Sequence, residues 1–430
     1  MSSEIIGVIL LVSVFFLLMI LRVGIGFAMG ISTIVTMTYL NLPIAVAFQG
    51  MVSGTKVFTF MAVPFFILAG DLMSNGGISD RLVRLANALV GWMRGGLAMV
   101  NCVDSMFFGG ISGSASADCA SLGPIVIPMM TEQGYDKDFS TCLTMATSVQ
   151  GMLIPPSHNM VVYAVTAGGV SIGSLFLGGL IPGIFLGLSM MVFSYFVALK
   201  RNYPVGEKFS FRVALKAAGE SLFGLMTIVI IMVGVSAGIM TATESAAIAV
   251  LWAFIVSVFV YKEVRIKDYV KIATRTIRTL SIIMILIAVS YSFGWVVTYL
   301  GIPRMITNGL LALTTNKYII LLLLNVLLIF LGMIMSMSSI ILILTPILVP
   351  VLQTIGVDLV HFGVILILNL GIGLLTPPVG GVLYIGSAIS GIKVGKLTRS
   401  MVPFYLVMFL VLMIITYVPQ ITTFLPNLMR

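Results

Sequence analysis

The chain has few charged residues. Only 9% of its 430 residues are Asp, Glu, Lys or Arg, whereas 60% are hydrophobic. Soluble domains carry about 25% charged residues, and the mean hydropathy here is +1.18. The apolar stretches are longer than the ~20 residues that a helix needs to cross a bilayer, and they do not alternate as barrel strands do. The composition therefore predicts an all-α polytopic membrane protein.

Cysteine and histidine are also scarce. The three cysteines, Cys102, Cys119 and Cys142, form no CxxC pattern, and there are two histidines. This excludes a disulfide framework and a zinc cluster. The chain has no phosphate-binding loop or nucleophile elbow, and the neighbouring Ser157 and His158 do not make a triad. We therefore expect no enzymatic activity.

The net charge of +9 would suggest nucleic-acid binding in a soluble protein. Here the basic residues gather in short loops between apolar stretches, which is typical of a topology signal, so no nucleic-acid partner is expected. The first apolar run, Ile5 to Leu21, lacks a basic segment before it and is interpreted as a mature helix rather than a cleavable signal peptide.

Twelve apolar segments are predicted, nearly all helical. Eight are simple spans, at about 4–21, 25–40, 57–75, 172–199, 220–240, 243–261, 279–300 and 401–424. Two more, 138–168 and 358–391, contain adjacent prolines, which remove backbone donors and break a helix. The last two, 95–131 and 317–352, are interrupted by small polar residues and are predicted to be re-entrant hairpins.

The two proline pairs belong to an internal repeat. Pro155 and Pro377 are 222 positions apart, and the same offset relates several residues that fix backbone shape. These pairs are Gly110 with Gly332, Ser114 with Ser336, Ser116 with Ser338, Pro124 with Pro346, Pro128 with Pro350, Asp136 with Asp358 and Gly151 with Gly373. We infer a duplication: a first repeat over 1–200, a cytoplasmic connector over 201–219 and a second repeat over 220–430.

The distribution of positive charge predicts that the halves are inverted. Segment 262–278, interpreted as a loop, carries six basic residues, whereas its counterpart 40–56 has only Lys56. Segment 392–399 carries three, and 170–177 has none. Basic loops mark the cytoplasmic side, so equivalent loops lie on opposite faces. Five crossings and one hairpin per half satisfy this pattern and place both termini in the periplasm. Segments 79–92 and 301–313 are expected to be arm helices lying in the membrane interface.

The hairpin tips are rich in glycine and small hydroxyl residues. A helix that ends inside the membrane presents carbonyl and hydroxyl oxygens, which suit a hard cation such as Na⁺. The helix that restarts after the tip offers free N–H groups to a carboxylate. We predict one Na⁺ site at each meeting of tip and break. Site 1 comprises Ser112, Gly113, Ser114, Gly151 and Pro155, and site 2 comprises Ser336, Ser338, Gly373, Thr376 and Pro378.

The predicted substrate site combines both tips and both breaks. Its residues are Ser112, Ser114, Ser157, His158, Asn159, Ser338 and Thr376. His158 and Asn159 occur only in the first half, where Gly380 and Gly381 replace them in the second, so this pair suits an asymmetric substrate. Asp71, Asp104, Asp118 and Glu244 are candidate intramembrane acids. No arginine is expected at the site.

These motifs resemble the large membrane subunit of tripartite ATP-independent periplasmic (TRAP) transporters, of the DctM/SiaM type. The likeness covers essentially the whole chain, and its residues are Val63–Met73, Gly110–Asp118, Leu153–Ser157, Thr241–Ala246 and Leu375–Gly380. It implies an elevator-type fold, Na⁺-driven uptake across the inner membrane, a small four-helix membrane partner and a periplasmic substrate-binding protein. Membrane lipids are the remaining expected partners.

The residues after the first proline pair read Ser157-His158-Asn159, which looks like the sialic-acid branch. The resemblance therefore implies import of N-acetylneuraminate. A C4-dicarboxylate permease of the same family remains an alternative, as does a stand-alone Na⁺/dicarboxylate symporter. A channel is disfavoured because the polar residues gather at two tips rather than along a continuous lining.

Overall fold

The protein is an elongated bundle of helices. The computed structural model describes residues 3–264 and 266–429. Within this part of the chain the regular elements are helices, and the only bridge of strand type joins Arg94 to Val205. Eight of the described helical segments are long and apolar enough to cross a membrane. The chain is thus an all-helical, multi-pass membrane protein, as the composition predicts.

The first half contains ten α-helices within the described residues. They are α1 (Ser3–Ile20), α2 (Ile25–Tyr39), α3 (Ile44–Thr55), α4 (Ala62–Asn75), α5 (Ile78–Val90), α6 (Gly96–Ser112), α7 (Ala115–Glu132), α8 (Lys137–Ser148), α9 (His158–Ala167) and α10 (Ile172–Lys200). Helices α6 and α7 form the first predicted hairpin, and α8 and α9 are the two parts of the first broken helix.

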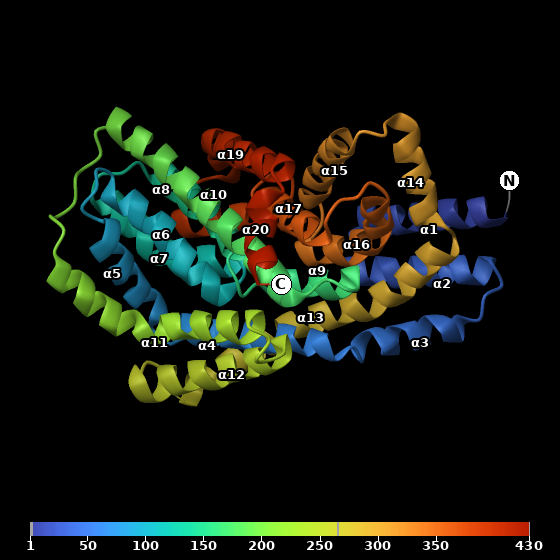
Figure 1. Ribbon diagram of the computed structural model, residues 1–430, viewed down its shortest axis with the longest axis horizontal. Helices are drawn as coiled ribbons and strands as arrows, with labels where there is room; N and C mark the ends of the chain where they lie inside the picture. The colour runs from blue at the N-terminus through green and yellow to red at the C-terminus, as the bar shows by residue number, and fades with distance from the viewer. Residues whose placement is uncertain (1–2, 265, 430) are drawn as a thin grey trace.

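The second half repeats this order. Its helices are α11 (Phe211–Ser236), α12 (Ala242–Ile255), α13 (Ile266–Tyr299), α14 (Ile302–Leu313), α15 (Lys317–Gly332), α16 (Met337–Thr354), α17 (Leu359–Gly373), α18 (Gly381–Ser390), α19 (Val394–Tyr417) and α20 (Gln420–Leu428). Helices α15 and α16 form the second hairpin, and α17 and α18 the second broken helix. In Figure 1 the two hairpins lie on opposite sides of the centre, along the long axis.

The offset of the sequence repeat returns in the helix boundaries. Helices α7 and α16, α8 and α17, and α10 and α19 begin 222 positions apart. In each half a polar pair also fastens the hairpin to its broken helix, with Thr147 and Asn369 at equivalent positions. Thr147 on α8 donates to Asn101 on α6 over 3.1 Å, and Asn369 on α17 donates to Asn325 on α15 over 2.9 Å. The two halves therefore share side-chain contacts as well as helix order.

Segments 40–56 and 262–278, expected to be loops, are largely helical. The first contains α3, and the second forms the beginning of α13, a single helix of 34 residues. Residues 262–293 contain no glycine or proline, and lysine and arginine favour helices, so positive charge alone does not end one. In the first half the equivalent region is divided between α3 and α4, where Pro64 lacks the N–H that would continue the helix.

Other boundaries differ less. Helix α11 begins at Phe211, inside the expected connector, so the stretch without helix covers 201–210. The arm helices are present as α5 and α14, within two residues of the expected ranges. In Figure 1, α11, α4, α12, α13 and α3 form a lower layer, and the hairpins and broken helices lie above it.

Candidate functional site

The two hairpin tips are built alike. Helix α6 ends at Gly113, whose φ of +59° is left-handed and whose N–H donates to the Gly109 carbonyl over 2.9 Å. Helix α7 then begins after Ser114, whose hydroxyl accepts the Ala117 N–H. In the second half Ser336 caps α16 by accepting the Ser339 N–H. Each tip thus presents a helix N-terminus beside small hydroxyl residues, the arrangement that favours an anion.

Both proline pairs interrupt their helices. The first lies in the stretch without helix between Met152 and His158, and the second between Gly373 and Gly381. The Pro155–Pro156 and Pro377–Pro378 peptide bonds are cis. The prediction of two broken helices is confirmed.

Each tip contacts the break of its own half. A Cβ on Gly109 would lie 2.2 Å from the Gly151 Cα, so the two backbones touch and only glycine fits. A Cβ on Gly373 would likewise lie 2.7 Å from the Gly332 Cα. The Val379 N–H also donates to the Met333 carbonyl over 3.1 Å. The structure therefore brings together the tips and breaks that the repeat pairs.

A cavity of about 270 Å³ opens at the first tip. Three predicted substrate residues, Ser112, Ser114 and His158, line it, as do Ser116, Asp71, Arg275 and Thr279. The cavity therefore combines hydroxyl groups, an imidazole, a carboxylate and a guanidinium.

Arg275 corrects the expectation that no arginine faces the site. It lies on α13, in the segment interpreted as a cytoplasmic loop, and its side chain is 61% exposed. Its Nε is 3.9 Å from Oδ1 of Asp71, whose Oδ2 accepts the Thr276 hydroxyl over 2.7 Å. A helical reading of this segment would have placed Arg275 and Thr279, which both line the cavity, one turn apart on the same face.

Asn159 connects the two halves of the site. The Ser338 hydroxyl donates to its Oδ1 over 3.4 Å, so α16 of the second half meets α9 of the first. The other residues predicted for Na⁺ site 2 do not gather around one cavity. Ser336 lines a neighbouring cavity of about 280 Å³ between α2, α13 and α16. Thr376 donates to the Ile372 carbonyl over 2.8 Å and lines neither of these two cavities.

Among the residues that the structure describes, three buried oxygens near the first break have no hydrogen-bond partner. They are Oγ of Ser157, Oδ2 of Asp118 and Oε1 of Gln150. A Cβ on Gly151 would lie 3.2 Å from that Asp118 oxygen, and Oδ1 of Asp118 accepts the Ser105 hydroxyl over 3.2 Å. Buried polar atoms without partners are costly. Pro155 lies close by, because a Cβ on Gly110 would be 3.2 Å from its carbonyl oxygen. These oxygens lie beside Gly151 and Pro155 of the predicted site 1, although neither Ser157 nor Asp118 is among the residues predicted for it, and oxygen ligands of this kind suit a hard cation.

The remaining acids have other environments. Both oxygens of Asp104 are buried and unpartnered among the described residues. Glu244 forms a capping box with Thr241 at the start of α12, the structural role that its position predicts.

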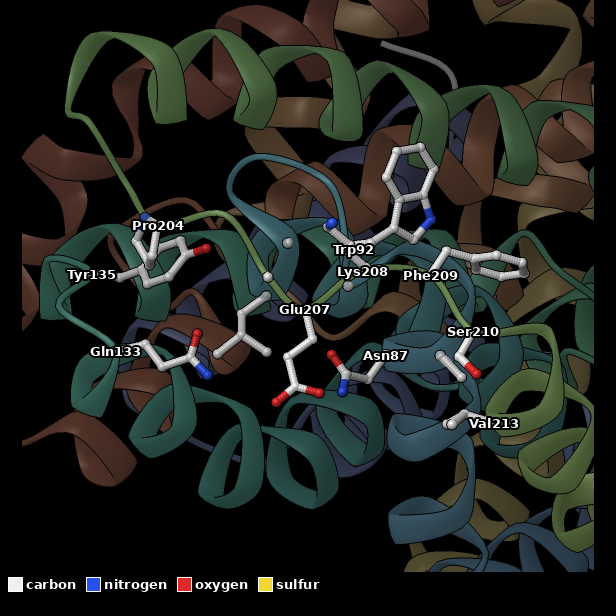
Figure 2. Close-up of a pocket in the computed structure, with 15 residues that line it drawn as sticks. Asn87, Trp92, Gln133, Tyr135, Pro204, Glu207, Lys208, Phe209, Ser210 and Val213 are labelled. Atoms are coloured by element: carbon white, nitrogen blue, oxygen red, sulfur yellow. The ribbon is translucent and has the colours of Figure 1, made fainter.

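A third cavity, of about 320 Å³, lies at the base of the first hairpin. Figure 2 shows its lining, which comes from the end of α5, the hairpin base and the connector, and includes Trp92, Tyr135, Glu207 and Lys208. None of the predicted site residues lines it.

The paired hairpins, the broken helices and the polar cavity define a membrane transporter. A solved transporter structure with the same fold, YdaH of Alcanivorax borkumensis, superimposes with a TM-score of 0.63 at 15% identity and covers 89% of this chain and 88% of its own. The family model of the tripartite ATP-independent periplasmic transporter, DctM component, matches residues 12–421. The chain belongs to this family of large TRAP permeases.

Named relatives have different substrates. The sialic acid TRAP transporter large permease protein SiaM of Vibrio cholerae is 40% identical over 382 residues, 89% of each chain. The C4-dicarboxylate TRAP transporter large permease protein DctM of Pseudomonas aeruginosa is 38% identical over 370 residues, 86% of each chain. These relatives are transport proteins, and so is this chain; it is not an enzyme.

Proposed function

We propose that the chain is the permease subunit of a Na⁺-coupled transporter that imports a carboxylate, with N-acetylneuraminate as the first candidate. The observation that carries this proposal is the cavity at the first tip, where Arg275 and His158 converge with the N-terminus of α7. A guanidinium and a helix N-terminus both favour a carboxylate.

The neighbouring side chains favour an asymmetric substrate. His158 and Asn159 supply polar groups beside the cavity, and the second half has Gly380 and Gly381 in their place. A sugar acid has hydroxyl and amide groups for such side chains, whereas a C4-dicarboxylate would need a second cationic or helix-terminal partner. A C4-dicarboxylate remains the alternative because a relative with that substrate is almost equally similar.

Sodium is the coupling ion that we propose for site 1. Beside the residues predicted for that site, Ser157 at the end of the first break and Asp118 on α7 offer unpartnered buried oxygens. An ion bound there would neutralise the buried carboxylate and hold the tip against the break, so that the cavity beside it is fully formed. The equivalent contact between Gly332 and Gly373 supports a second site in the other half.

Transport would follow an elevator mechanism. The hairpins and broken helices contact one another and would move as one body against the layer formed by α3, α4, α11, α12 and α13. The family's tripartite description supports two partners, a small membrane subunit and a periplasmic binding protein that delivers the substrate. We place the complex in the bacterial inner membrane with both termini of this chain in the periplasm.

Uptake by proteoliposomes tests the proposal. With the small subunit and the loaded binding protein present, an inward Na⁺ gradient should drive accumulation of N-acetylneuraminate. Equal uptake in Na⁺-free buffer would refute Na⁺ coupling, and uptake of succinate in place of N-acetylneuraminate would support the alternative substrate. Uptake by this chain alone would indicate a stand-alone symporter.

A further inference from the structure

A second feature of the structure lies away from the transport cavity. A cleft of about 590 Å³ is formed by the end of α10, the start of α19 and the start of α8. Its walls are apolar, with Phe193, Phe196 and Val197 on one side and Pro403 and Phe404 on the other. Phe196 is 64% exposed, and Val402 and Leu406 on the outer face of α19 are also exposed. A membrane protein directs such a surface toward lipid.

Positive charges surround one end of this cleft. Lys200, Arg201 and Arg399 all line it. Arg201 is held by Asp136 over 2.6 Å, whereas no ion pair involves Lys200 or Arg399 among the described residues. The one carboxylate in the lining, Asp138, already accepts hydrogen bonds from the Ser400 hydroxyl and the Phe139 N–H, both over 2.9 Å. Two cations are therefore available for a ligand.

We propose that this cleft binds an anionic membrane phospholipid. Lys200 and Arg399 hold its phosphate, and an acyl chain lies along Phe196 and Pro403. The charges favour this occupant, because cations sit at one end of an apolar groove and match a molecule with one anionic end and one apolar end. Basic pockets between membrane helices on the cytoplasmic side commonly bind such headgroups, and lysine and arginine extend along apolar surface to reach them.

The position of the cleft gives the lipid a consequence for transport. Helix α8 is itself part of the first broken helix, and α10 and α19 both pack against α8 and α17, so all three belong to the body that contains the broken helices. A lipid bound here would be attached to that body rather than to the layer below it. Its headgroup would anchor the cytoplasmic end of α10 and α19 at the membrane surface.

Lipid retention tests this proposal directly. The full-length protein, purified with its membrane partner, is equilibrated with equal amounts of phosphatidylglycerol and phosphatidylcholine, and the bound lipids are counted by native mass spectrometry. Wild type should retain phosphatidylglycerol in preference. The ratio of bound phosphatidylglycerol to bound phosphatidylcholine should fall roughly 30-fold in the double variant Lys200→Gln/Arg399→Gln and about fivefold in each single variant.

Matched variants separate charge from folding. Lys200→Arg keeps the charge and should keep the preference, and Lys208→Gln removes a lysine from the other cavity and should have no effect. Equal retention of the two lipids by wild type would overturn the proposal. An unchanged preference in Lys200→Gln and Arg399→Gln would overturn it as well. Displacement of the lipid by millimolar glycerol 3-phosphate would overturn it too, because a soluble anion would then be the ligand.

Discussion

Ser338 of the second hairpin donates a hydrogen bond of 3.4 Å to Asn159, in the helix that restarts after the first proline pair. The two residues come from different halves and are 179 positions apart. This contact lies where α9 packs against α16, and in the equivalent place α18 packs against α7, so the broken helix of each half also contacts the hairpin of the other.

The first prediction concerns this pair. Asn159→Ala and Ser338→Ala should each lower uptake about fivefold or more. The double variant should take up substrate no more slowly than the slower single variant, because the effects of two substitutions in one hydrogen-bond network do not add. Proteoliposome uptake measures the effect. Strictly additive losses would show that the two residues act independently.

Arg275 should set the affinity for the carboxylate. Arg275→Gln removes the guanidinium beside the cavity, and we expect the KM for uptake to rise about tenfold, since a charged hydrogen bond contributes roughly 1.5–3 kcal/mol. Arg275→Lys should retain part of the affinity. Arg278→Gln, on the same helix but outside the cavity lining, is the control. A KM unchanged by Arg275→Gln would remove this residue from the substrate site.

The glycine contact should be intolerant of a methyl group. Gly109→Ala places a Cβ 2.2 Å from Gly151, so the hairpin must move away from the break at a cost of roughly 1–3 kcal/mol. Thermal unfolding of the purified protein and uptake should both decline. Gly219→Ala meets open space in a helix and should be neutral or slightly stabilising. Equal behaviour of the two variants would indicate that the tip does not depend on close backbone contact.

The proline pairs should affect transport more than folding. Replacing Pro155 and Pro156 with alanine would allow α8 to continue toward α9 and close the break that forms the cavity. We expect uptake to fall to background while the amount of protein in the membrane changes less than about twofold, because alanine is a much better helix former than proline. Parallel loss of uptake and expression would assign the prolines a structural role only.

The contact between the connector and the base of the first hairpin should depend on pH. A hydrogen bond from the Tyr203 hydroxyl, and then Arg201, lowers the pKa of Asp136. Because the folded pKa is depressed, the stabilisation is present above the unfolded pKa of about 3.9 and is lost as the pH falls through the folded value. Tyr203→Phe should move this loss to higher pH in thermal unfolding scans. An identical pH profile would show that Tyr203 does not act through Asp136.

The repeat could be read from the sequence because glycine, proline and serine determine backbone shape locally. Ser114 and Ser336 are both helix caps, and both proline pairs break their helices. Arg275 could not be placed in this way. Arg275 and Asp71 are about 200 residues apart in the sequence, and they meet only because α13 is helical. A hydropathy pattern predicts a loop for such a basic segment.

The length of α13 has a consequence for how the family can vary. At 1.5 Å per residue its 34 residues span about 51 Å, more than the ~30 Å hydrocarbon core. A continuous helix fixes the direction of Arg275 by its register, so inserting one residue between Arg275 and the membrane centre would turn the guanidinium by about 100° away from the cavity. The divided counterpart, α3 and α4, can absorb such an insertion at its junction. Insertions and deletions should therefore be far rarer in α13 than between α3 and α4.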